Sequence, residues 1–385
     1  MRGTGLFFGR LICCQGGFMS DKDRAWLVLA NARISVDKLT ALLDEYGAVE
    51  KVAHLSTAAL ARSGVTDELR AAMLNPDERS IAKSLAWLEK PGNRIIPCDS
   101  DDYPELLQQI PGPPTLLYMV GNAAALHMPA LSIVGSRNPT RGGRENAYAF
   151  AKHLGQCGFC IVSGLAQGID TSAHEGALDA DAMTVAFLGH GIDRVYPAGN
   201  RDLAHRISQN GALVSEYPLG SPPRREHFPQ RNRLISGLSL GTLVVEAARR
   251  SGSLITARLA GEQGREVFAI PGSIHSPLSR GCHQLIKQGA KLVESAEDIV
   301  SELGALAGYL MENDTDAVHR ESPTIDHDAD YEILLNTLSY DPASADELAE
   351  DSGLTIDQVS SMLLILELEE KIEALSGGKY LIRNK

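Results

Sequence analysis

The sequence predicts an α/β protein built on an open parallel sheet, with a helical module before the sheet and a winged helix after it. Two observations predict the sheet: short apolar runs ending in glycine alternate with helix-period segments from residue 132 to residue 294, and strands separated by single helices form right-handed crossovers. About six or seven parallel strands are expected. The winged helix is predicted by helical segments at 331–339, 345–352 and 355–370, followed by a hairpin at Gly377 and Gly378.

The 385 residues divide into five expected segments. The first is expected to be a disordered or wrongly assigned extension, because Met19 stands directly before a polar helix start and Gly9 and Arg10 interrupt the apolar patch that precedes it. The expected boundaries are 1–18 for the extension, 19–90 for the helical module, 91–305 for the α/β core, 306–330 for an acidic linker and 331–385 for the winged helix.

Residues 19–90 alternate short helical segments with polar breaks and are punctuated by Gly47 and Gly64. A module of this size is either a SAM-like or helix-hairpin-helix relative that contacts nucleic acid, or a protein-interaction bundle. Its few cations and the lack of a Gly-x-Gly hairpin favour the second reading. Between residues 91 and 118, prolines around Gly112 place a strand after a rigid turn, which is expected to add an edge to the sheet.

The sheet is expected to be organised around residues 132–178, where two strands end at Gly135 and Gly164 and a helix follows each. Asp170 or Thr171 is expected to cap the second of these helices. The carboxyl ends of parallel strands form a crevice in which helix N-termini present free N–H groups to anions. The expected ligand therefore carries phosphate, although tight strand-to-helix turns would by themselves also explain the glycines.

The common nucleotide-binding loops are absent from the sequence. The loop after Gly135 lacks the second and third glycines of G-x-G-x-x-G, the second strand ends in Ser163 rather than an acid, and no G-x-x-x-x-G-K-[ST] occurs. Neither a cofactor nor a metal is expected. Cys157 and Cys160 have redox spacing, but no second pair completes a metal site, so the six cysteines are interpreted as buried structural thiols of a reducing cytoplasm.

The net charge of −13 is concentrated in the C-terminal part of the chain. Residues 131–299 contain 18 Lys and Arg against 15 Asp and Glu, whereas residues 300–385 contain 5 against 19. Most cations of the core are arginine, which forms forked contacts with phosphate. A polyanionic ligand is thus compatible with the core. The recognition helix expected at 355–369 contains no Lys or Arg, which favours contact with protein over the DNA major groove.

Two later stretches add to the candidate site. Residues 224–233 contain four arginines, and Arg231 and Arg233 stand at a helix start, where cations gain nothing from the helix dipole. They either bind an anion or belong to a solvated loop.

Residues 251–258 offer hydroxyls and amides for a phosphate or sugar. The candidates for stacking on bases are Tyr196, Tyr217, His227 and Phe228. The candidate phosphate-binding residues are Gly135, Ser136, Arg137, Ser163, Gly164, Gly168, Arg201, Arg231, Asn232, Arg233, Ser251, Gly252, Ser253 and Thr256.

Five motifs in order resemble the DprA/Smf family of bacterial DNA-processing proteins: residues 132–137, 163–170, 231–239, 245–257 and 265–272. The resemblance implies a cytoplasmic protein with a Rossmann-like core that binds single-stranded DNA and forms a homodimer through that core. It implies a mediator that loads RecA onto incoming DNA in natural transformation, without catalytic residues and without membrane contact. Arg137 matches the family's DNA-binding arginine. Where many members have lysine after Tyr-Pro, this chain has Ala198, and Arg201 is the expected substitute.

The alternative function is a nucleotide-processing enzyme of the phosphoribohydrolase type, which has a related Rossmann-like fold and a Pro-Gly-Gly-x-Gly-Thr-x-x-Glu motif. In this chain Thr242 precedes Glu246 by four residues instead of three, and the paired glycines are absent. Glu246 and Asp170 are therefore not expected to be catalytic.

Overall fold

The computed structural model describes residues 21–303 without a gap and, beyond them, residues 334, 337, 343–356, 359, 362, 363, 366, 372–375 and 379–382. These residues belong to two compact units, Met1–Thr315 and Asp316–Lys385. The extension expected at 1–18 and the linker expected at 306–330 lie outside the described residues.

The larger unit contains a nine-stranded sheet in the order β1-β2-β6-β5-β4-β3-β7-β8-β9. The strands from β6 to β9 in this order are all parallel, which confirms the predicted open parallel sheet. β2 pairs antiparallel with both β1 and β6, so the stretch around Gly112 does add an edge. The strands are β1 Asn93–Pro97, β2 Leu116–Gly121, β3 Ala130–Val134, β4 Cys160–Ser163, β5 Thr184–Leu188, β6 Gly211–Ser215, β7 Gly241–Val244, β8 Glu266–Ala269 and β9 Lys291–Leu292.

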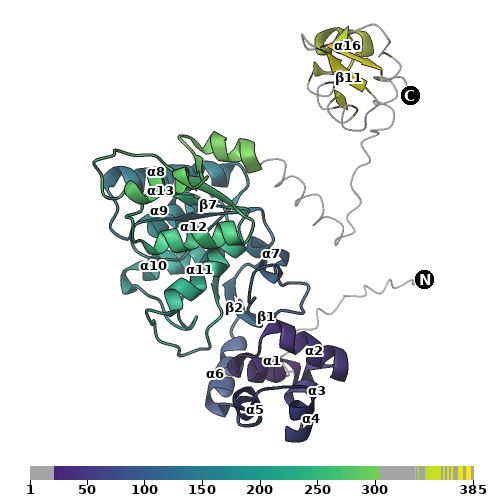
Figure 1. Ribbon diagram of the computed structural model, residues 1–385, viewed down its shortest axis with the longest axis vertical. Helices are drawn as coiled ribbons and strands as arrows, with labels where there is room; N and C mark the ends of the chain where they lie inside the picture. Colours follow the sequence, from purple (N-terminus) through teal and green to yellow (C-terminus); the bar gives the residue numbers. More distant parts are fainter. Residues whose placement is uncertain are drawn as a thin grey trace, which may run out of the picture. The chain divides into compact units, whose positions relative to one another are not determined.

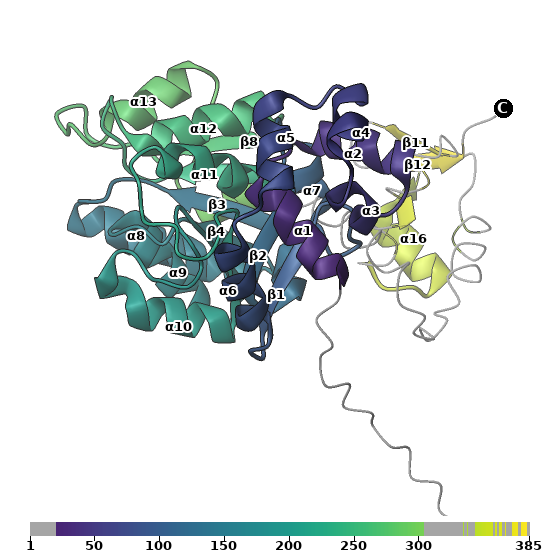
Figure 2. The same cartoon turned by 90° about the horizontal axis from the view of Figure 1, so that it is seen from below.

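Helices cover both faces of this sheet (Figure 1), with α8, α9 and α10 on one face and α11, α12 and α13 on the other (Figure 2). Side chains of β3 alternate accordingly: Leu131 and Ile133 pack with α8 and α9, whereas Ala130 and Val134 belong to the core beneath α11 to α13. This is the period-two pattern of a strand buried on both sides. The helices are α8 Arg141–Gln156, α9 Ile169–Leu178, α10 Arg201–Gln209, α11 His227–Gly237, α12 Gly252–Glu262 and α13 Arg280–Lys287.

Six helices precede the sheet and pack against its antiparallel edge. Their core includes the fully buried Trp26 together with Tyr118 of β2 and Ile207 of α10. The Thr115 hydroxyl donates a hydrogen bond of 2.6 Å to the carbonyl of Ile34, which joins the module to the approach to β2. The module and the sheet therefore share one hydrophobic core. Its helices are α1 Asp21–Asn31, α2 Val36–Tyr46, α3 Val49–Ala53, α4 Thr57–Arg62, α5 Asp67–Leu74 and α6 Glu78–Leu88.

The described part of the smaller unit has the elements expected of a winged helix. β10 (Ala343–Ser344), β12 (Lys379–Ile382) and β11 (Ile372–Leu375) form a sheet in that order, and the predicted hairpin pairs Ile372 with Ile382. Helix α16 occupies Ala345–Ser352, begins with a capping box between Ser344 and Glu347, and ends at Gly353 in the left-handed conformation. Most of the helices expected at 331–339 and 355–370 lies outside the described residues.

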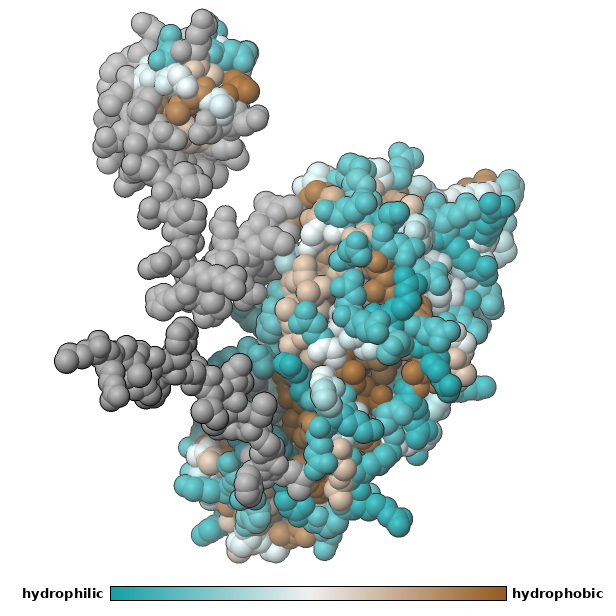
Figure 3. Space-filling model, turned by 180° about the vertical axis from the view of Figure 1, so that it is seen from behind, coloured by the Kyte–Doolittle hydropathy of each residue, from teal (hydrophilic) through white to brown (hydrophobic). Residues whose placement is uncertain are grey.

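Hydrophilic residues cover much of the face of the molecule drawn in Figure 3, with apolar residues in patches between them. Within the part of the chain that the structure describes, no helix combines the length and apolar character needed to cross a membrane.

The expectation that the cysteines are buried needs a correction. Cys160 and Cys282 are buried, and burial raises the pKa of the Cys160 thiol to about 12. Cys157 is exposed, because it follows the last turn of α8 at the surface.

Candidate nucleic-acid interface

The loops after β3 and β7 enclose a hollow of about 730 Å³, called the rim pocket here. β3 has β4 on one side and β7 on the other, so the strand order reverses between these loops. In open α/β sheets, ligands bind in the crevice at such a switch point. The first loop contributes Gly135, Ser136 and Arg137, and the second contributes Ala248, Arg250, Ser251, Gly252 and Ser253, while Tyr196, Arg225, Phe228 and Asn232 also line the pocket.

Eight of the fourteen candidate residues line the rim pocket: Gly135, Ser136, Arg137, Arg231, Asn232, Ser251, Gly252 and Ser253. These residues come from three separate motifs, which the fold brings to one place. The remaining six do not line it: Ser163, Gly164, Gly168, Arg201, Arg233 and Thr256.

Arg137 and two aromatic rings lie together in the rim pocket. The guanidinium of Arg137 lies over the Phe228 ring, 5.5 Å from its centroid, and the centroids of Phe228 and Tyr196 are 5.9 Å apart. Tyr196 is 48% exposed, so one ring of the pair is available for stacking. A cation above an accessible aromatic pair can bind a phosphate and an adjacent base together.

The other two proposed stacking residues have a different position. Tyr217 and His227 are each 7% exposed, and their rings stack on each other with centroids 4.1 Å apart. The Tyr217 hydroxyl donates to the carbonyl of His227 at 3.2 Å. The expectation that these rings lie on the rim is therefore wrong, because they are packed face to face beneath the surface.

Arg231 is a buried structural cation, which corrects the expectation of a free arginine. It is 3% exposed, and its Nη1 donates to the carbonyls of Gly164, at 2.7 Å, and Phe187. Desolvation lowers the pKa of Arg231 to about 10, against the opposing effect of the Asp170 charge. The side chain ties α11 to the ends of β4 and β5, directly below the rim pocket.

Arg233 and Arg201 also differ from expectation. Arg233 forms an ion pair with Glu216 and lines a separate hollow on the other side of α11. Helical geometry explains this, since residues two positions apart on a helix point in different directions. Arg201 is exposed at the start of α10 but lies outside the rim pocket, so the structure does not place the expected substitute there.

The remaining four candidates support the loops from within. Ser163 is fully buried and donates to the carbonyl of Ile133 at 2.7 Å, and Thr256 is 1% exposed. Gly164 lies against Arg231, where a Cβ would overlap the guanidinium. Gly168 has φ of 88°, and a Cβ there would collide with the carbonyl of Ser136. These residues shape the rim without presenting groups to a ligand.

Asp170 and Thr171 do not cap α9, contrary to the prediction. The residue before the helix is Gly168, without a side-chain cap. Asp170 lies in the first turn, and its Oδ2 accepts hydrogen bonds from the N–H groups of Gly164, at 3.1 Å, and Ala166, at 3.3 Å. Thr171 donates to the carbonyl of Ala166 at 2.8 Å. Both side chains therefore stabilise the loop after β4. Burial raises the pKa of Asp170, and the charge of Arg231 opposes this rise.

Glu246, the carboxylate that follows β7, is engaged at the start of α8. It accepts hydrogen bonds from the N–H group of Thr140, at 2.9 Å, and from its hydroxyl, at 2.5 Å. Thr140 is the N-cap of α8 and accepts from the N–H group of Gly143. A carboxylate in this position compensates the helix dipole. This contact gives Glu246 a structural role at the start of α8.

Sequence reasoning missed two arginines of the rim. Arg225 and Arg250 are exposed and line the pocket with Arg137, so three exposed arginines border one hollow, in addition to the buried Arg231. The available signals were the cluster of arginines at 224–233 and the pair Arg249 and Arg250 just before the predicted hydroxyl cradle. A sequence pattern does not show which of several neighbouring arginines points into a pocket.

Comparisons of the sequence and of the structure with known proteins indicate the same family. The model of the family described as DNA recombination-mediator protein A matches residues 94–304, and that of the DprA winged helix domain matches residues 318–378. Protein Smf of Escherichia coli is 41% identical over 336 residues, 87% of this chain and 90% of its own.

Two solved structures extend the comparison. DNA processing protein A of Streptococcus pneumoniae is similar with a TM-score of 0.64 and 37% identity, covering 73% of this chain and 97% of that one. DNA processing protein A of Helicobacter pylori, whose structure is described for its single-stranded DNA binding mode, has a TM-score of 0.50 and 30% identity. The match covers 55% of this chain and 95% of that one.

Proposed function

Because the chain belongs to the family of DNA recombination-mediator protein A, we propose that it binds single-stranded DNA in the rim pocket and acts as a recombination mediator. The observation that carries this proposal is the grouping of three exposed arginines with the accessible Tyr196 and Phe228 at the switch point of the sheet. Phosphates pair with the arginines and bases stack on the rings, a combination that tolerates any sequence. The described single-strand binding of the Helicobacter pylori relative supports the same assignment.

The test is a titration of the full chain with single-stranded and duplex DNA over a series of salt concentrations, in which fluorescence anisotropy measures binding. Single strands should bind more tightly, without marked sequence preference, and the logarithm of the binding constant should fall with the logarithm of the salt concentration. Three arginine contacts give a slope of about −2, since each phosphate contributes about −0.7 in a single strand. Tighter binding of the duplex would overturn the proposal.

The further steps of the proposed role concern partners. We propose that the chain loads RecA onto incoming DNA in natural transformation, forms a homodimer through the core and acts in the cytoplasm. Membership of the family supports this proposal. Two exposed apolar side chains of the core support self-association: Ile274 is 74% exposed, and Leu292 of the edge strand β9 is 44% exposed. The acidic composition of residues 300–385 supports a protein partner for the winged helix. A mediator of this kind needs no catalytic group, and the engagement of Glu246 with Thr140 supports that view.

Removing residues 316–385 tests the assignment of DNA binding to the core, because this cut follows the boundary between the two compact units. The truncated chain should bind single-stranded DNA with equal or greater affinity, since most of the acidic charge lies in the part removed. The measurement is the same anisotropy titration, with circular dichroism as a check of folding. Loss of most of the affinity in a folded truncated chain would mean that the C-terminal unit contacts DNA.

A further inference from the structure

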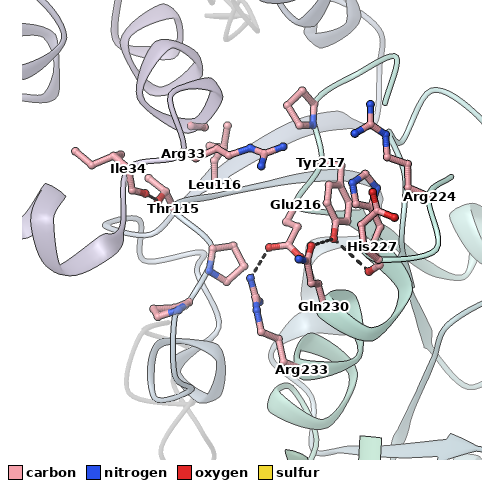
Figure 4. Close-up of a pocket in the computed structure, with 15 residues that line it drawn as sticks. Arg33, Ile34, Thr115, Leu116, Glu216, Tyr217, Arg224, His227, Gln230 and Arg233 are labelled. Atoms are coloured by element: carbon pink, nitrogen blue, oxygen red, sulfur yellow. Dashed lines mark hydrogen bonds and ion pairs between the residues drawn. The ribbon is translucent and has the colours of Figure 1, made fainter. Parts of the chain in front are cut away.

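A second hollow, of about 500 Å³, lies between the helical module and α11 (Figure 4). It is called the module pocket here. Its walls come from the turn between α1 and α2, the prolines before β2, the loop after β6 and the first turns of α11. The motifs assigned to the rim pocket do not explain it, although residues 224–233 contribute to both hollows.

Two arginines stand at the opening of the module pocket. Arg33 comes from the helical module and Arg224 from the loop before α11, and both are exposed and extend toward the same opening (Figure 4). Neither guanidinium has a hydrogen bond or an ion pair with another residue in the described ranges. Arg33 has φ of 59°, a conformation that non-glycine residues adopt rarely. Such a pair of unpartnered cations from two parts of the fold can bind an anion.

The floor of the module pocket is polar. Arg233 pairs with Glu216, but Glu216 Oε1 and Arg233 Nη1 are buried without a hydrogen-bond partner among the described residues. Such atoms normally bind water or another polar group. Glu226 also lines the pocket, so three arginines face two glutamates and positive charge remains in excess. These features favour a polar, anionic occupant over an apolar one.

The two hollows are back to back across one short segment. Arg224 lines the module pocket and its neighbour Arg225 lines the rim pocket. Along α11, Gln230 and Arg233 face the first, whereas Phe228 and Asn232 face the second. An α-helix with its side chains is roughly 10–12 Å wide, so a single strand longer than a few nucleotides can contact both hollows.

We propose that the module pocket binds the phosphate backbone of the same single strand after it leaves the rim pocket, so that the helical module takes part in DNA binding. This inference rests on the proposed function and extends it to a second contact. It changes the reading of the module from a protein-interaction bundle to part of the nucleic-acid surface.

The experiment compares Arg33→Gln and Arg224→Gln with the matched control Arg79→Gln, which removes an exposed arginine of α6 that does not line the pocket. Each is titrated with deoxythymidine oligomers of about 4 and about 12 nucleotides, which span the range of single-strand sites. For the longer oligomer, each pocket variant should lose roughly fivefold in affinity and about 0.7 in salt slope. For the shorter oligomer, and for Arg79→Gln with both, binding should stay unchanged.

Arg137→Ala is measured alongside to separate this inference from the proposed function. If Arg137→Ala weakens binding of both oligomers while Arg33→Gln and Arg224→Gln weaken neither, the module pocket is not on the DNA path and only this inference fails. If the unaltered chain binds neither oligomer, the proposed function fails with it. Thymidine monophosphate is the third probe, and its tight binding to the unaltered chain, lost in Arg33→Gln, would assign the pocket to free nucleotides and overturn the inference.

Discussion

Replacing Arg231 by methionine is expected to destabilise the larger unit by about 3–5 kcal/mol, the range found when one partner of a buried charged pair is removed. The variant leaves the carbonyls of Gly164 and Phe187 without their donor and leaves Asp170 buried without its neighbouring cation. The midpoint of thermal unfolding should fall by about 10 °C, judged from the typical shift per kcal/mol. Circular dichroism during heating measures it.

Arg225→Met is the matched control, because Arg225 is an exposed arginine of the same segment, and such a surface change is expected to stay within about 0.5 kcal/mol. The loss in Arg231→Met should also shrink as the pH falls. Without Arg231 the folded-state pKa of Asp170 rises further, so the folded variant holds this proton more tightly than the unfolded chain, and stability lost at high pH returns at low pH. Equal unfolding midpoints for Arg231→Met and Arg225→Met would show that the buried contacts contribute little.

The sheet could be predicted from the sequence because its signals are local. The parallel strands β3, β4 and β5 are short apolar runs that are each followed by glycine, and α8, at residues 141–156, is the helix expected after Gly135. The order of the strands could not be predicted in this way, because the reversal between β3 and β7 depends on packing between segments more than a hundred residues apart. The switch point could therefore be located only in the structure.

The candidate site was predicted in part for a similar reason. Gly135, Ser136 and Arg137 follow directly from the end of β3, and Ser251, Gly252 and Ser253 from the start of α12. The arginines of α11 could not be assigned from composition, since helical rotation points Arg231 into the protein and Arg233 toward Glu216. Burial decided their role, and a charge pattern alone carries no information about burial.

The largest functional effect is expected from Arg137→Ala. Arg137 is exposed on the loop after β3, and its guanidinium lies over the Phe228 ring. Its removal deletes a phosphate contact at the centre of the rim pocket and the cation above the stacking rings. The affinity for single-stranded DNA should fall by at least about tenfold, and the salt slope should lose about 0.7 to 1.

The control for this variant is Arg141→Ala, four residues along the chain. Arg141 is exposed and pairs with Glu145 within α8, outside the rim pocket, so its removal should leave affinity unchanged. Both variants should keep the thermal midpoint of the unaltered chain, because neither arginine is buried. Arg137→Lys is expected to fall between the two, since lysine keeps the charge but loses the planar fork and its stacking on Phe228. If Arg137→Ala matches Arg141→Ala in both affinity and salt slope, the strand does not pass over Phe228 and the rim pocket is not the DNA site.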